Sequence, residues 1–152
     1  TADRSVCGRT QSRLRRVPPD TKPSASASRA PARYGTAAAS TTVAGVGEVT
    51  TAPDGVQEIT LQTQDDYVFT PDHFTVAPGE VRLTVVNAAR QTTHNFRFTP
   101  GDGPEVIQPE IPLLAPGESR TIEFTVSVPG GHPFECSFHT QLGQVGTMTV
   151  QG

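Results

Sequence analysis

Four side chains in the second half of the sequence have the types and spacing to bind one metal ion. Cys136, His139 and Gln144 form the pattern C-x2-H-x4-Q. A thiolate and an imidazole three residues apart can bind one ion from a tight loop, provided that another strand supplies a second imidazole. His94 can be that imidazole, because it alternates with two phenylalanines in a strand pattern that directs it into the core. Two histidines, one cysteine and a weak axial donor are the ligand set of a blue-copper electron-transfer site.

Other interpretations of these donors were weighed. Cys136 alone would more often be a small buried hydrophobe, and His94 alone a satisfied core histidine, but their joint spacing favours ligation. A zinc site from the same two histidines and one cysteine is chemically reasonable, although the strand context favours copper. A Cys-His hydrolase is disfavoured because no glycine-rich nucleophile turn precedes Cys136. Enzymes with several copper ions need more histidines or cysteines than this segment offers.

Short strands must position these donors. After residue 47, apolar and polar residues alternate with the period of two that half-buried strands show, and no segment predicts a helix. Proline-glycine turns at 77–80, 115–118 and 128–131 separate the strands. The residues predicted to face inward are Ile59, Leu61, Phe74, Val76, Val81, Leu83, Val85, His94, Phe96, Phe98, Ile122, Phe124, Val126, Phe134, Cys136, Gly146, Met148 and Val150. Seven or eight short strands predict an all-β sandwich.

The same alternation sorts the remaining candidate donors. Gln144 falls on the inward face of the last strand, and Met148, four residues further along, is assigned to core packing. His73 is expected in a surface loop. His132 shares the parity of Cys136, but roughly 13 Å of strand rise separates them and excludes joint ligation.

Charge and composition divide the chain into two parts. Residues 1–46 hold 8 Lys+Arg against 2 Asp+Glu, and residues 47–152 hold 4 against 13, so the two parts carry +6 and −9. We expect residues 1–47 to be a disordered basic tail or linker and residues 48–152 to be one domain. An acidic domain disfavours nucleic-acid binding and favours a cationic partner. No stretch approaches the roughly 18 consecutive apolar residues of a membrane helix, so no integral membrane segment is expected.

Three features together resemble the cupredoxins, the family of plastocyanin, azurin and their bacterial relatives. They are Asn87 at a strand end, the run Thr93-His94-Asn95-Phe96, and the C-x2-H-x4 loop before Gly146-Thr147-Met148-Thr149-Val150. The resemblance covers roughly residues 57–152. It implies a Greek-key β-sandwich that binds one copper ion per chain.

Carried over to this sequence, the resemblance makes His94, Cys136 and His139 the equatorial copper ligands. Asn95 would pin the ligand loop by hydrogen bonding. Gln144 stands where plastocyanin-like members have an axial Met, which resembles stellacyanin. An amide oxygen is a harder donor than a thioether, so it should favour Cu(II) and lower the reduction potential.

The expected function is one-electron transfer between redox partners by a monomeric carrier that is not an enzyme. By the resemblance, His139 would be the electron port at the surface, with Phe138 and Leu142 as an apolar rim for a cationic redox partner. An extracytoplasmic location follows from the resemblance. Two alternatives stay open: a copper carrier or buffer without a redox partner, and a metal-free binding module on the same scaffold.

Overall fold

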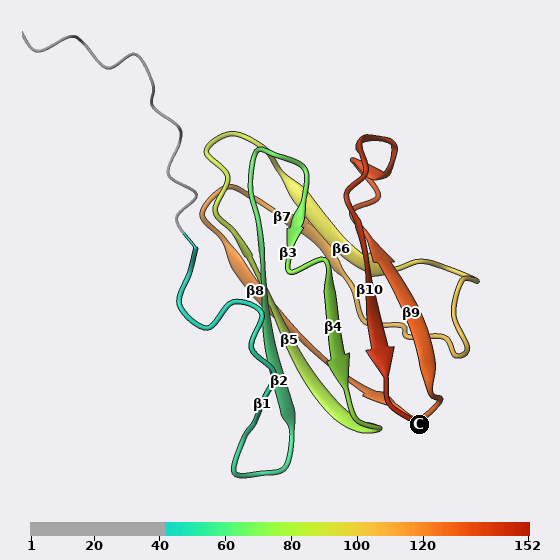
Figure 1. Ribbon diagram of the computed structural model, residues 1–152. Coiled ribbons are helices and arrows are strands. Elements are labelled where there is room, and N and C mark those ends of the chain that lie inside the picture. The colour runs from blue at the N-terminus through green and yellow to red at the C-terminus, as the bar shows by residue number, and fades with distance from the viewer. Residues whose placement is uncertain (1–41) are drawn as a thin grey trace, which may run out of the picture. The chain divides into compact units, whose positions relative to one another are not determined.

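A computed structural model describes residues 42–152 as two packed β-sheets (Figure 1). The strands are β1 (Thr50–Thr51), β2 (Gln57–Thr63), β3 (Phe69–Thr70), β4 (His73–Val76), β5 (Gly79–Asn87), β6 (His94–Phe98), β7 (Ile111–Leu114), β8 (Ser119–Val126), β9 (Gly130–Glu135) and β10 (Val145–Val150). The one helical element in this part of the chain is a 3-10 turn, η1 (Thr140–Leu142). The predicted all-β sandwich is confirmed. Eight strands have four or more residues, and the two-residue strands β1 and β3 are too short for an alternating pattern to reveal.

The two sheets are mixed. The first runs β1-β2-β5-β8, with β3 also paired to β2, and the second runs β4-β10-β9-β6-β7. The pairs β2 with β5 and β4 with β10 are parallel, whereas the other strand pairs are antiparallel. Because β6 and β9 are antiparallel neighbours, the start of β6 and the end of β9 lie at the same end of the second sheet. This arrangement brings His94 and Cys136 together.

The core lies between the sheets and contains most of the residues that the alternation predicts to face inward, together with Phe69, Ile111 and Leu114, which it did not predict. Of the residues predicted to face inward, Ile122 alone is partly rather than fully buried. Phe134 lies at the centre, with ring centroids 5.4, 5.8 and 5.2 Å from those of Phe69, Phe74 and Phe96. Gly146 makes this packing possible, because a Cβ atom there would lie 2.3 Å from the Phe134 ring and 2.4 Å from the carbonyl oxygen of Asp72.

Residues just before the predicted domain start contact the first sheet. Val46 bridges to Thr60, Gly47 N–H donates to the Thr60 carbonyl at 2.9 Å, and Val43 N–H donates to Gln62 Oε1 at 2.7 Å. Residues 1–41, which make up most of the predicted tail, lie outside the described residues. The boundary at 47/48 therefore stays a prediction. Within the described chain, no helix is long and apolar enough to cross a membrane.

Candidate metal centre

The four predicted donors come from two places at one end of the second sheet. His94 begins β6, while Cys136, His139 and Gln144 belong to the connection between β9 and β10. This connection is closed at its base, because Cys136 N–H donates to the Gln144 carbonyl at 3.0 Å. Inside the loop, His139 N–H and the Thr140 hydroxyl both donate to the Cys136 carbonyl, at 3.0 and 2.9 Å. The spacing C-x2-H-x4-Q thus corresponds to a compact, internally hydrogen-bonded loop.

The donor atoms of these residues converge. One ligand atom each from His94, Cys136 and His139 lie within 4.8 Å of one another, and no other His, Cys, Asp or Glu cluster of this kind occurs in residues 42–152. Cys136 Sγ lies 3.4 Å from His139 Nδ1 and 3.9 Å from His94 Nδ1. Gln144 Oε1 lies 2.9 Å from His94 Nδ1 and 3.2 Å from His139 Nδ1. Three of the four side chains are fully buried, and His139 is partly exposed.

Neighbouring groups fix which atoms face the centre. The Gln64 carbonyl can only accept, so His94 Nε2 carries the proton and donates to it at 2.9 Å, which leaves a lone pair on Nδ1. Gln144 Nε2 donates to Thr63 Oγ1 at 2.6 Å, which turns Oε1 toward the histidines. Two lone pairs then face each other at 2.9 Å with no hydrogen between them. A bound cation would stabilise this arrangement.

The protonation state of His94 also suits ligation. Burial of the imidazole lowers the pKa of His94 below its ordinary value, because the charged form loses its hydration. A neutral imidazole is the form that coordinates a metal ion. The histidine is therefore ready to bind without first losing a proton.

Asn95 makes the hydrogen bonds expected of it. Its backbone N–H donates to Cys136 Sγ at 3.5 Å, and its side chain exchanges two hydrogen bonds with Ser137, at 2.7 and 2.8 Å. These bonds hold the start of the ligand loop against β6.

Sequence reasoning missed the segment between β2 and β3. Asp65 accepts hydrogen bonds from the backbone N–H groups of Arg90, Gln91 and Thr92 and from the Thr92 hydroxyl. These bonds, led by the one from Arg90, lower the pKa of Asp65 to about 2. Tyr67, also in this segment, packs against His139. The only signal in the sequence is the adjacent pair Asp65 and Asp66, and this pair does not indicate which backbone N–H groups will donate hydrogen bonds to the carboxylates.

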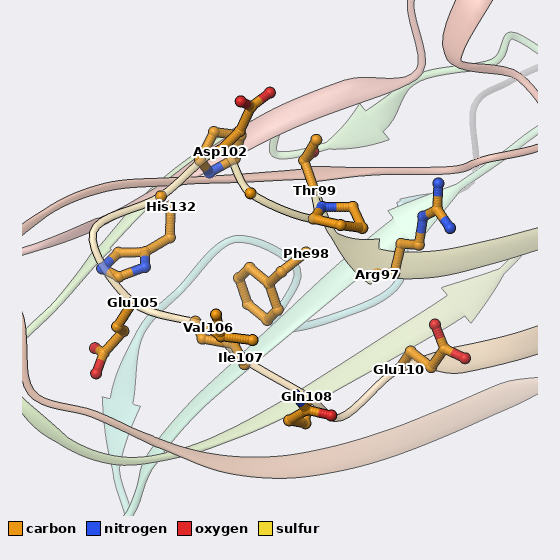
Figure 2. Close-up of a pocket in the computed structure, with 14 residues that line it drawn as sticks. Arg97, Phe98, Thr99, Asp102, Glu105, Val106, Ile107, Gln108, Glu110 and His132 are labelled. Atoms are coloured by element: carbon orange, nitrogen blue, oxygen red, sulfur yellow. The ribbon is translucent and has the colours of Figure 1, made fainter.

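The other candidates lie apart from the centre. His73 is exposed, as predicted, and pairs with Asp72 at 3.0 Å, but it begins strand β4 instead of lying in a loop. Met148 is fully buried in the hydrophobic core, as predicted. His132 is 2% exposed, and its Nε2 donates to the Val128 carbonyl at 3.0 Å. It borders a cavity of about 210 Å³ formed by the loop that follows β6, with Phe98, Ile107 and Glu110 among the lining residues (Figure 2).

Comparison with known families identifies the domain. The model of the cupredoxin-like domain matches residues 36–150, which is most of the chain. The chain belongs to the cupredoxin-like family. The predicted family resemblance is thus confirmed, whereas the stellacyanin-like role of Gln144 stays a prediction.

Curated relatives of this cupredoxin include several plastocyanins. Plastocyanin from Solanum crispum is 35% identical over 101 residues, which cover 61% of this chain and 98% of the relative. Plastocyanin A/B from Petroselinum crispum is 34% identical over 97 residues, covering 61% and 98%. With plastocyanin from Nostoc punctiforme the identity is 32% over 92 residues, covering 55% of this chain and 65% of the relative. The chain spans 54% to 65% of the length of four of these plastocyanins, the one from Nostoc punctiforme included.

Solved structures agree on the fold of this cupredoxin. A dithionite-reduced auracyanin from Roseiflexus castenholzii matches with a TM-score of 0.56 and 26% identity, covering 62% of this chain and 97% of that one. The metal-binding domain of the Streptococcus pneumoniae Cu(I)-exporting ATPase CopA matches with a TM-score of 0.55 and 20% identity, covering 73% and 100%. At that identity the second likeness concerns the fold alone.

Proposed function

We propose that this cupredoxin is a type 1 copper protein that carries single electrons between redox partners and is not an enzyme. His94, Cys136 and His139 would be the equatorial ligands of one copper ion, and Gln144 the axial ligand. When bound, copper would supply the one-electron Cu(II)/Cu(I) couple. The observation that carries the proposal is the convergence of ligand atoms from two imidazoles, one thiol and one amide in a largely buried space.

The protein would hold the copper ligands rigidly in place. The donors are held by hydrogen bonds from groups outside the centre: Gln64 for His94, Thr63 for Gln144 and Asn95 for Cys136. Ligands held in place in this way need to move little when the charge of the centre changes, which favours fast electron exchange. Two histidines and a thiolate also suit zinc, but they are the donor set expected of a blue-copper site.

The surface around the ligand loop supports docking of a partner protein. Phe138 and Leu142, the two residues expected to form the apolar rim, lie in the loop and are 52% and 61% exposed, and Val145 at the start of β10 is 46% exposed. The surplus of acidic residues in 47–152 would orient a cationic partner, with an association rate that falls as salt is added. We further propose that the protein is a monomer and works outside the cytoplasm.

Electron exchange with a cationic c-type cytochrome tests this function. The reduced copper protein should reduce the cytochrome in a stopped-flow experiment, with a second-order rate constant that decreases with ionic strength. Leu142→Ser should slow the reaction about tenfold, because it removes apolar surface from the rim without changing the charge. Val106→Ser is the matched control, since Val106 is 78% exposed and lies in the loop that follows β6. Absence of electron exchange, together with transfer of copper to an acceptor apoprotein, would instead indicate a copper carrier.

A further inference from the structure

The segment between β2 and β3 contacts both histidines of the candidate centre. The Gln64 carbonyl accepts the hydrogen bond from His94 Nε2, at 2.9 Å. Three residues later, the ring of Tyr67 lies against His139, with ring centroids 4.8 Å apart and ring planes inclined by 54°. The same tyrosine meets His94 edge-on, at 6.5 Å and 68°. One short segment therefore reaches both imidazoles.

The two histidines are held in different ways. The ring of His94 is fully buried, and its Nε2 is fixed by the hydrogen bond that it donates to the Gln64 carbonyl. His139 is partly exposed, and its Nε2 has no hydrogen-bond partner among residues 42–152. Apart from the contacts of Nδ1 with Cys136 and Gln144, its orientation depends on ring contacts. The ring of Tyr67, at 4.8 Å, is closer to that of His139 than the rings of His94, at 5.1 Å, and Phe138, at 6.3 Å.

The backbone at Tyr67 is strained, which suggests that the position of its ring matters. Tyr67 has a φ of 58° and is the only non-glycine residue with positive φ in the described chain. A bulky side chain rarely adopts this conformation, and such residues persist where the surrounding structure imposes them. Here Asp66 Oδ1 accepts a hydrogen bond from Val68 N–H at 3.2 Å, and Asp65 ties the segment to residues 90–92.

We propose that Tyr67 is a positioning residue of the candidate metal centre, and this inference rests on the proposed function. Its ring holds the His139 imidazole with Nδ1 directed at the other donors. It also covers the gap between the two histidines and keeps small external ligands away from the ion. Both effects come from the ring rather than the hydroxyl, because Tyr67 meets the two histidines through ring contacts.

Tyr67→Gly and Tyr67→Phe form a matched pair for the test. Glycine adopts positive φ without strain, so Tyr67→Gly removes the ring and should leave the segment folded. Tyr67→Phe keeps the ring and removes only the hydroxyl. The first measurement uses metal-free protein, where NMR couplings report the χ1 rotamers of His139. We expect one rotamer in the parent and in Tyr67→Phe, and averaging between rotamers in Tyr67→Gly.

The second measurement titrates azide into the Cu(II)-loaded proteins and follows the visible and paramagnetic resonance spectra. Azide should bind Tyr67→Gly roughly two- to tenfold more tightly than the parent, the size expected for loss of one ring contact, and Tyr67→Phe like the parent. A single His139 rotamer and parent-like azide affinity in Tyr67→Gly would overturn the inference, as would a Phe variant that behaves like the Gly variant. If the parent shows no blue band, the proposed function fails, while the metal-free rotamers still test Tyr67.

Discussion

His94 in β6 and His132 in β9 are both buried in the second sheet, and both carry their proton on Nε2. The groups around the two histidines differ. Their exposed fractions are 0% and 2%, and each donates from Nε2 to a backbone carbonyl, at 2.9 and 3.0 Å. Nδ1 of His94 faces a thiol and an amide oxygen, whereas Nδ1 of His132 has no partner among the described residues. Burial and tautomer alone thus do not make a histidine a ligand. The neighbouring elements decide, here the β9–β10 loop at one end of the sheet.

The loops beside the two histidines are fixed by the same device. Asp65, next to the residue that holds His94, accepts hydrogen bonds from the backbone of residues 90–92. Glu105, near His132, accepts hydrogen bonds from Ser127 and Val128 N–H, and these bonds lower its pKa below the ordinary value. A carboxylate that binds backbone donors therefore accompanies both sites. Such a carboxylate stabilises the loop beside each histidine, so its presence does not distinguish the candidate metal centre from the surroundings of His132.

The strongest test of this comparison replaces each histidine in turn. We expect His94→Gln to abolish the type 1 copper spectrum, because one of two imidazole ligands is lost. His132→Gln should keep the spectrum, since this residue lies away from the centre. Visible absorption after Cu(II) addition measures the effect, and far-ultraviolet circular dichroism of the metal-free variants checks the fold. A blue His94→Gln variant, or a colourless but folded His132→Gln variant, would contradict the claim that His94 is a ligand and His132 is not.

Gly146→Ala tests the packing of β10 against Phe134, which lies on β9 two residues after His132. A Cβ atom at this position would overlap the Phe134 ring and the Asp72 carbonyl, so the ring or the strand must shift. Overpacking of this kind costs about 1–3 kcal/mol, and we expect the free energy of unfolding to fall by that amount. Urea denaturation measures it. Gly101→Ala serves as a control for adding a methyl group, because its Cβ atom would meet no atom within 4 Å, although its positive φ adds some backbone strain. Equal stability of Gly146→Ala and the parent would contradict the packing argument.

Gln144→Met tests whether Gln144, whose amide oxygen faces His94, is the axial ligand. Replacing the amide oxygen by a thioether should raise the reduction potential, because the softer donor favours Cu(I). Cyclic voltammetry measures the shift. Met148→Leu is the matched control, since Met148 is buried in the core and should leave the potential unchanged. An unchanged or lower potential in Gln144→Met would argue against axial ligation by Gln144.

The smallest predicted effect concerns Asp65, and it is a dependence of the free energy of unfolding on pH. Its pKa in the folded protein is lowered from 3.8 to about 2, so its carboxylate stabilises the fold above its ordinary pKa. This contribution disappears as the pH falls through about 2. Asp65→Asn should therefore be less stable than the parent at pH 6, and the difference should shrink toward pH 2. Urea midpoints of both metal-free proteins at the two pH values measure it, and a difference that does not change with pH would contradict the assignment.

Strand parity explains why much of the centre was predictable from the sequence. Alternation places every second side chain on the inner face, so His94, Cys136 and Gln144 could be assigned to the core before any contact was known. Loop contacts follow no such period. The contacts of Asp65 and Tyr67 depend on how the chain turns after β2, and the missing partner of His132 Nδ1 depends on the loop that follows β6. These features required the folded structure.

A Cu(II) titration of the purified protein, followed by visible absorption and paramagnetic resonance, tests the central claim most directly. We predict an intense blue thiolate-to-copper band that saturates at one copper per chain, with a small copper hyperfine splitting. Cys136→Ala should lose the band and keep the fold of the metal-free protein. A colourless parent protein, or one with ordinary tetragonal copper signals, would contradict the assignment of His94, Cys136 and His139 as a blue-copper centre.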